Sequence, residues 1–283
     1  MNLTSATQVK NILASHGIHP KKRFGQNFLI DGNVLGKLLD STDISQQSNV
    51  LEIGPGLGVV TRELANRAGR VVCVEVDRDM EPILQALLDD KPNCEIVIED
   101  FLKIDIEQFL SERGDGRWVV IANLPYYITT PILTRLIEAK SNFDTITLMV
   151  QREVAARLKS VAGSSDYGAI SVFVQYHCMV ESVMKVSRNV FFPIPDVDSE
   201  LIKLTVRPKP AVDVADEKLF FSIVRASFGK RRKTLLNALS TSTDLCWDRG
   251  RTEVILTSAD IDGSRRGETL SISEFARICA AVN

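Results

Sequence analysis

The stretch NVLEIGPGLG, residues 49–58, decides which fold this chain adopts. A short apolar run typical of a buried strand passes into three glycines separated by single residues, and a helical pattern follows over 59–68. Glycine lets the backbone turn tightly and approach a ligand closely, so the arrangement is typical of α/β folds with a ligand at a strand end. Glycine also serves ordinary tight turns, so the loop alone does not identify a ligand.

Outward from this stretch, strand patterns alternate with helix patterns. We expect strands at 49–53, 70–76, 95–98, 118–122, 145–150, 179–186 and 199–206, and helices at 59–68, 80–88, 104–110, 130–139 and 151–160. Strands that alternate with helices form a parallel sheet with helices on both faces. The predicted class is therefore α/β, with a Rossmann-like sheet whose ligand binds at the carboxyl ends of the strands.

A proline-rich break separates two parts of the chain. The stretch RPKP, residues 207–210, carries two prolines, which disfavour both helix and sheet. Beyond it the pattern becomes mainly helical. We predict an α/β domain over residues 1–208 and a smaller, mainly α domain over 209–283.

The composition limits the class of protein. The chain has 283 residues and a formal net charge of -2, so a nucleic-acid-binding surface has to be a local basic cluster. Five scattered cysteines favour reduced thiols in the cytoplasm, and with three histidines they form no zinc-ligand pattern. The apolar runs are too short to span a membrane, and the N-terminus lacks a signal-peptide pattern. We expect a cytoplasmic monomer without a metal or membrane contact.

Acidic residues follow the second and third predicted strands. Glu75 lies 19 residues after Gly56, close to the spacing at which dinucleotide-binding proteins place the acid that binds ribose. Asp100 can accept a hydrogen bond from an adenine amine. Together these residues indicate a cofactor that contains adenosine, although Glu75 alone is also compatible with a solvated strand end.

The type of cofactor follows from the rest of the motif. Glu52 lies inside it, the glycine spacing is G-x-G-x-G rather than G-x-G-x-x-G, and no positive cluster is present for a pyrophosphate. These features favour S-adenosylmethionine over NAD, and an NAD-dependent enzyme is the alternative.

The fourth predicted strand leads into NLPY, residues 123–126. Adenine N6 is a poor nucleophile because its lone pair is delocalised into the ring, so a site has to aim that lone pair at the methyl donor. The side-chain oxygen of Asn123 and the carbonyl of Leu124 can each accept an N6 hydrogen, and Tyr126 offers a face for base stacking. The motif predicts methyl transfer to adenine N6 by positioning and electrostatics; a buried turn with aromatic packing is the alternative.

Five motifs in one order resemble the rRNA adenine N6,N6-dimethyltransferase family, and most of all its small-subunit (16S) branch. The motifs are RFGQNFL at 23–29, EIGPGLG at 52–58, NLPY at 123–126, FFPIPDVDS at 191–199 and RRKTL at 231–235. The likeness implies transfer of two methyl groups to each of two adjacent adenosines near the 3′ end of 16S rRNA. It also implies a pre-ribosomal small subunit as partner and a role in small-subunit biogenesis.

The resemblance also implies site residues. Those that would contact the cofactor are Asn27, Leu29, Gly54, Gly56, Glu75, Asp100 and Asn123. Tyr126 and Phe191 would hold the target adenine between their rings. The chain departs from the family pattern at Asp196, where a basic residue is common, and at Tyr127, where Asn is common.

Two basic clusters are candidates for phosphate contacts. They consist of Lys21, Lys22 and Arg23, and of Arg225, Lys230, Arg231, Arg232 and Lys233. Ordinary solvated faces carry similar runs, but in a chain of negative net charge local clustering favours RNA binding.

Two further functions are alternatives. A relative that methylates large-subunit rRNA and confers macrolide resistance shares the catalytic motifs, and the motifs at 191–199 and 231–235 favour the small-subunit branch by likeness only. A non-catalytic ribosome assembly factor would bind rRNA without needing an intact cofactor motif.

Overall fold

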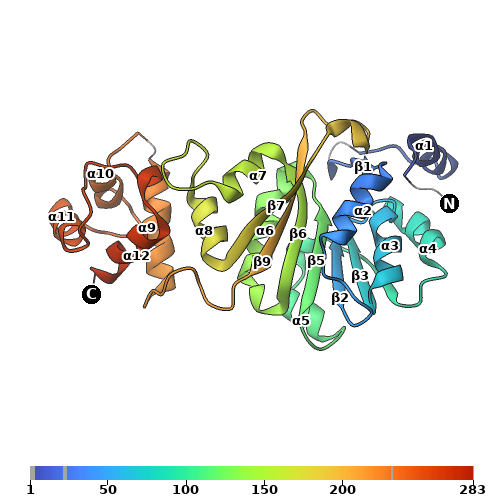
Figure 1. Ribbon diagram of the computed structural model, residues 1–283, viewed down its shortest axis with the longest axis horizontal. Coiled ribbons are helices and arrows are strands. Elements are labelled where there is room, and N and C mark those ends of the chain that lie inside the picture. The colour runs from blue at the N-terminus through green and yellow to red at the C-terminus, as the bar shows by residue number, and fades with distance from the viewer. Residues whose placement is uncertain (1–3, 22–23, 231, 283) are drawn as a thin grey trace. The chain divides into compact units, whose positions relative to one another are not determined.

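A computed structural model describes residues 4–21, 24–230 and 232–282, which form two compact units (Figure 1). Unit 1 comprises the chain up to residue 155 together with 181–206, and unit 2 comprises 156–180 together with the chain from 207 onward. From the sequence, residues 156–180 are expected in the first domain, whereas their contacts place them in unit 2. The reason is a long-range contact that no local pattern encodes, since α8 (Ala169–His177) packs against α9 (Glu217–Gly229).

Most of unit 1 is built on a sheet with the strand order β4-β3-β2-β5-β6-β9-β7. The strands are β2 (Asn49–Ile53), β3 (Arg70–Glu75), β4 (Cys94–Ile98), β5 (Trp118–Asn123), β6 (Phe143–Gln151), β7 (Cys178–Val186) and β9 (Ser199–Val206). β2 pairs in parallel with β3 and with β5, β3 pairs in parallel with β4, and β5 pairs in parallel with β6. The predicted α/β class is confirmed, and each predicted strand is present within one or two residues of its expected ends.

The sheet is mixed rather than parallel throughout, because β9 runs antiparallel to β6. β7 and β9 are neighbours in the sheet, and no α-helix lies between them in the chain. Parallel neighbours need a long crossover, usually helical, whereas a short connection reverses the chain direction. The expectation of an all-parallel sheet is therefore wrong for its last strand.

The sheet of unit 1 is buried by helices on both of its faces. The helices are α1 (Ala6–Ser15), α2 (Gly32–Asp40), α3 (Val59–Arg67), α4 (Glu81–Leu88), α5 (Ile106–Ser111), α6 (Thr129–Glu138) and the first part of α7 (Arg152–Lys159). Apolar residues of α1, α2, α3 and α4 join Val50, Val71 and Ile121 in one core cluster. Val72 and Val120, on the opposite face, are also buried, as expected for parallel strands covered on both sides.

A two-stranded ribbon ties the N-terminal segment to a distant part of unit 1. β1 (Phe28–Leu29) pairs antiparallel with β8 (Phe191–Phe192), with Leu29 opposite Phe191. This pairing joins two of the sequence motifs that lie more than 160 residues apart in the chain.

Unit 2 is helical, with α9 at its centre. Its helices are α8, α9, α10 (Leu235–Ser240), α11 (Arg249–Ser258) and α12 (Ile272–Ala280), and α9 contacts α8, α10 and α12. The side chains that α9 buries, Phe220, Ile223, Val224 and Ser227, follow the i, i+3, i+4, i+7 spacing of one helix face. Over the described residues no helix is long and apolar enough to cross a membrane.

Candidate active site

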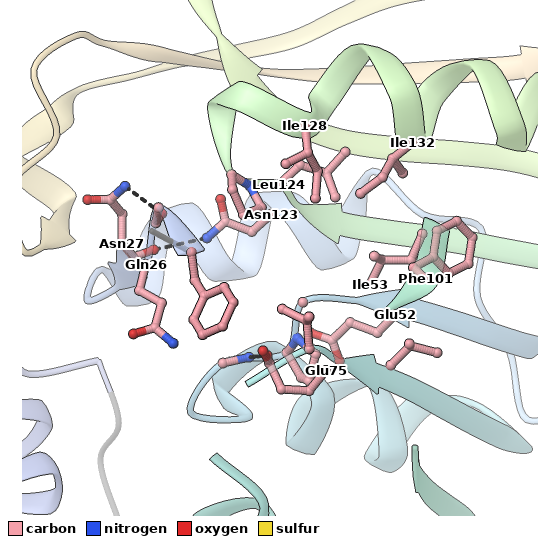
Figure 2. Close-up of a pocket in the computed structure, with 18 of the residues that line it drawn as sticks. Gln26, Asn27, Glu52, Ile53, Glu75, Phe101, Asn123, Leu124, Ile128 and Ile132 are labelled. Carbon is pink, nitrogen blue, oxygen red and sulfur yellow. Dashed lines mark hydrogen bonds between the residues drawn. The ribbon is translucent and has the colours of Figure 1, made fainter. Parts of the chain in front are cut away.

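A cavity of about 290 Å³ lies at the carboxyl ends of β2, β3, β4 and β5 (Figure 2). In the sheet, β3 lies on one side of β2 and β5 on the other. The chain connections leave these central strands in opposite directions, and a crevice opens at such a switch point. All seven residues expected at the cofactor line this cavity: Asn27, Leu29, Gly54, Gly56, Glu75, Asp100 and Asn123.

The glycine loop after β2 needs its glycines both for backbone conformation and for space. Gly54, Gly56 and Gly58 have φ values of 73°, 56° and 76°, in the region that L side chains rarely adopt. A Cβ on Gly56 would lie 3.0 Å from the Phe28 ring, and one on Gly58 would lie 2.8 Å from a methyl group of Leu87. The loop is therefore in close contact with Phe28 of the N-terminal segment at Gly56 and with Leu87 of α4 at Gly58. Residues 54–57 of the loop line the cavity.

The Glu75 carboxylate is held by two backbone amides. Oε2 accepts from the amide of Gly56 at 3.0 Å, and Oε1 accepts from the amide of Asp77 at 2.9 Å. The side chain is buried, and this burial raises the pKa of the carboxyl group, although the backbone donors oppose the shift. Each oxygen keeps a second lone pair, so Glu75 can accept hydrogen bonds from two neighbouring hydroxyls.

Glu52 is a second buried acid of the cavity. No hydrogen bond to its Oε2 is found among the described residues. Burial raises the pKa of Glu52 to about 8; the nearby Thr61 hydroxyl opposes this shift and the charge of Glu75 adds to it. A buried polar atom without a partner is costly, so Oε2 is suited to a ligand that brings a donor or a positive charge. The sequence draws attention to Glu52 only as an unusual member of the glycine motif.

The charge of the lining matches a cationic ligand. It contains the acids Glu52, Glu75, Glu99 and Asp100 and, within the described part of the chain, no Lys, Arg or His. A pyrophosphate needs positive side chains or a helix N-terminus, whereas a sulfonium is favoured by nearby negative charge. The donor set thus fits S-adenosylmethionine better than a dinucleotide.

Asn123, at the end of β5, is oriented by the N-terminal segment. Its Nδ2 donates to the backbone carbonyl of Asn27 at 3.1 Å, and the Asn27 side chain donates to the carbonyl of Gly25 at 3.0 Å (Figure 2). Because a carbonyl can only accept, the amide nitrogen of Asn123 has to face Asn27. The side-chain oxygen is then left for another donor, as the predicted role requires.

Apolar side chains complete the cavity. Phe28, Phe101, Ile128 and Ile132 line it. Phe28 belongs to the motif at 23–29, whereas the other three, labelled in Figure 2, lie outside the five motifs. Phe101 follows Asp100, whose Oδ1 caps a short 3-10 helix by accepting from the Leu102 amide at 3.0 Å. The other carboxylate oxygen of Asp100 can accept from a ligand.

The structure does not bring together all of the predicted catalytic residues. Leu124 lines the cavity beside Asn123. Tyr126 begins a 3-10 helix (Tyr126–Ile128), and its side chain lies outside what the structure describes. Phe191 is 2% exposed in the core cluster of unit 1 and is not among the residues that line the cavity. Its stacking role stays a prediction.

The predicted RNA-binding residues have different surroundings. Four lie exposed at the end of α9 and just after it in unit 2: Arg225, Lys230, Arg232 and Lys233. Lys21 is instead paired with Asp77 and Asp79 inside unit 1, at 2.6 and 2.5 Å. Lys22, Arg23 and Arg231 lie outside the described residues.

Comparison with known proteins identifies relatives over nearly the full length. The family model of the ribosomal RNA adenine dimethylases matches residues 18–278. Proteins of Bacillus cytotoxicus and Bacillus mycoides, both named ribosomal RNA small subunit methyltransferase A, are 46% identical to this chain, and the match covers 99% of it and 97% of each relative.

Solved structures of similar fold include two methyltransferases. A dimethyladenosine transferase from Plasmodium falciparum matches with a TM-score of 0.75 over 89% of this chain and 95% of its own, at 24% identity, which bears on the fold alone. The 23S rRNA methyltransferase ErmE matches with a TM-score of 0.69 over 90% of this chain and 99% of its own, at 28% identity.

Proposed function

Because this chain belongs to the ribosomal RNA adenine dimethylase family, we propose that it methylates two adjacent adenosines near the 3′ end of small-subunit (16S) rRNA. The methyl groups come from S-adenosylmethionine, and the product is N6,N6-dimethyladenosine. The choice of the small subunit is supported by the names of the relatives that share 46% identity. The chemistry is supported by Asn123, which the Asn27 carbonyl orients at an acid-lined cavity.

Different residues of the cavity bind different portions of the cofactor. The loop of Gly54 and Gly56 receives the methionine portion, Glu75 accepts the ribose hydroxyls and Asp100 accepts from the adenine amine. S-adenosylmethionine, when bound, supplies a methyl group on a positively charged sulfur. Glu75 stabilises positive charge in a buried site, where water screens it weakly, and a cationic ligand in turn favours the charged form of Glu52.

Asn123 and Leu124 hold the target amine. The Asn123 oxygen accepts one N6 hydrogen, and the Leu124 carbonyl accepts the other. These two bonds turn the nitrogen lone pair toward the methyl donor and favour the geometry of attack. The amine proton leaves after attack, so the site needs no strong base. Tyr126 and Phe191 stack on the base in this proposal.

Unit 2 supplies attraction for RNA. The exposed residues Arg225, Lys230, Arg232 and Lys233 contact phosphates in this proposal. Arg231 belongs to the same run of sequence, and Lys22 and Arg23 form a separate basic cluster in the sequence near the N-terminus. The substrate in this proposal is a cytoplasmic pre-ribosomal small subunit, which the enzyme meets as a monomer during subunit biogenesis.

The decisive experiment is radiolabelled methyl transfer to purified small subunits that lack adenine dimethylation, with unmodified large subunits in parallel. Label recovered from small-subunit rRNA as N6,N6-dimethyladenosine is the expected result. Label only in large-subunit rRNA would move the function to the resistance type of methyltransferase. Absence of label from both, with cofactor bound, would favour an assembly factor, and stabilisation by NAD alone would contradict the cofactor.

A further inference from the structure

Asp77 is the centre of a hydrogen-bonded cluster that the proposed reaction does not use. Its side chain is only 3% exposed. Oδ1 accepts from Lys21 Nζ at 2.6 Å, and Oδ2 accepts from Gln26 Nε2 at 2.8 Å. The backbone amide of Lys21 also donates to Gln26 Oε1 at 2.8 Å. Both oxygens of one buried carboxylate are thus bound by the N-terminal segment.

The same residue is bonded to the cofactor site through its main chain. The Asp77 amide donates to Oε1 of Glu75, the acid that faces the ribose in the proposed function. On the other side of the cluster, Gln26 is followed directly by Asn27, whose carbonyl orients Asn123. A continuous series of hydrogen bonds and one peptide link therefore connects Glu75 with Asn123, two polar residues that line the cavity, by way of Asp77.

The two carboxylates that bind Lys21 differ in burial. Asp79 accepts from Lys21 Nζ at 2.5 Å, but its side chain is 53% exposed, so water and salt screen this pair. Asp77 is buried, and a buried carboxylate that loses its partners is strongly unfavourable. The hydrogen bond to Asp77, followed by that to Asp79, raises the pKa of Lys21. The ion pair with Asp77 is therefore the one expected to hold the segment in place.

We propose that Asp77 is a positioning residue for the cofactor site. It fixes the segment of residues 24–29 against the end of β3, so that Asn27 and Glu75 are arranged before the cofactor binds. The inference rests on the proposed function, since it takes the cavity to hold S-adenosylmethionine. Without Asp77, part of the cofactor's binding energy has to order the segment. The affinity for the cofactor then falls more than the rate of methyl transfer in the bound complex.

The test compares Asp77→Asn with Asp79→Asn in the full-length protein. We expect Asp77→Asn to raise the Kd and the KM for S-adenosylmethionine about tenfold while kcat at saturation changes less than about threefold. Asp79→Asn should change either constant by less than about twofold. Asp90→Asn, which breaks the exposed pair with Arg62 away from the cavity, controls for loss of a surface charge.

Hydrogen exchange of the amides of residues 24–29 provides a readout that needs no ligand. Exchange should be faster in Asp77→Asn and in Lys21→Met, and Lys21→Arg should restore the wild-type rate. Equal exchange and equal Kd in wild type and Asp77→Asn would overturn the inference. If Asp77→Asn does not fold, Lys21→Met provides the test. An unchanged Kd and unchanged exchange in Lys21→Met would also overturn the inference. Wild-type protein that binds no S-adenosylmethionine would refute the proposed function, and the exchange rates would still decide whether Asp77 holds the segment.

Discussion

The charges of the cavity in unit 1 and those of the basic residues in unit 2 differ in sign and in exposure to solvent. In the cavity the charged residues are acidic, and one of them, Glu75, is buried and held by two backbone amides. Near the end of α9 the charges are basic and exposed, on the flexible side chains of Lys230, Arg232 and Lys233. A buried charge acts over a short distance and requires fixed geometry, whereas an exposed basic cluster attracts phosphate without fixed contacts and is screened by salt.

This difference separates chemistry from substrate capture. Changes in the cavity should alter kcat or the affinity for the cofactor and leave RNA binding intact. Changes in the basic cluster should alter RNA affinity and its salt dependence and leave the chemical step intact.

The largest effect is expected for Asn123→Ala. Loss of the oriented amide oxygen should lower kcat roughly 10²–10³-fold, because one positioning group of the target amine is removed. RNA affinity, measured by filter binding, should stay within a factor of two. Asn66→Ala, at the exposed end of α3, is the matched control. Methylation at the wild-type rate in Asn123→Ala would refute the role of Asn123.

Glu52 should make stability depend on pH. Its pKa in the folded protein is raised to about 8, so the folded state binds the proton more tightly than the unfolded state, and stability falls as pH rises from about 4.5 to about 8. As pH rises from 6 to 9, the free energy of unfolding of Glu52→Gln should increase relative to that of wild type by on the order of 3 kcal/mol. Urea unfolding without cofactor measures this difference; parallel pH curves for the two proteins would contradict the buried, unpartnered state of Glu52.

Glu75→Gln should weaken the cofactor site while leaving the chemical step largely intact. A charged hydrogen-bond acceptor is replaced by a neutral amide, which should raise the Kd for S-adenosylmethionine roughly 30-fold by calorimetry. Glu107→Gln, on the exposed side of α5, should bind like wild type. An equal loss of RNA affinity in Glu75→Gln would show that the two regions are not separable.

The smallest effect is expected in unit 2. Replacing both Lys230 and Lys233 by Gln should lower RNA affinity about tenfold at low salt and reduce the slope of log K against log salt by about 1–2. Lys37→Gln combined with Lys185→Gln removes two exposed charges from unit 1 and serves as the control. An unchanged salt slope in the unit 2 variant would remove these lysines from the RNA-binding surface.

Local patterns were sufficient to predict most of the sheet and the cofactor-facing residues. The strand over 49–53, the glycine loop and the acids at 75 and 100 are encoded by neighbouring residues, through apolar periodicity and the conformational freedom of glycine. The carboxyl ends of parallel strands meet at one edge of the sheet, so the order of strands and acids along the chain predicts that Glu75, Asp100 and Asn123 gather there.

Contacts between segments that are distant in the sequence determine the features that local patterns do not predict. Phe191 is buried by pairing with Leu29, Lys21 is held by Asp77, and residues 156–180 join unit 2 through α9. The antiparallel direction of β9 and the unpartnered oxygen of Glu52 likewise depend on which elements pack together. From its own sequence the chain reveals its α/β class and its motifs, because these follow from spacing along the backbone. The burial, partners and charge state of each motif residue follow only from the folded chain, because they depend on neighbours that are far away in the sequence.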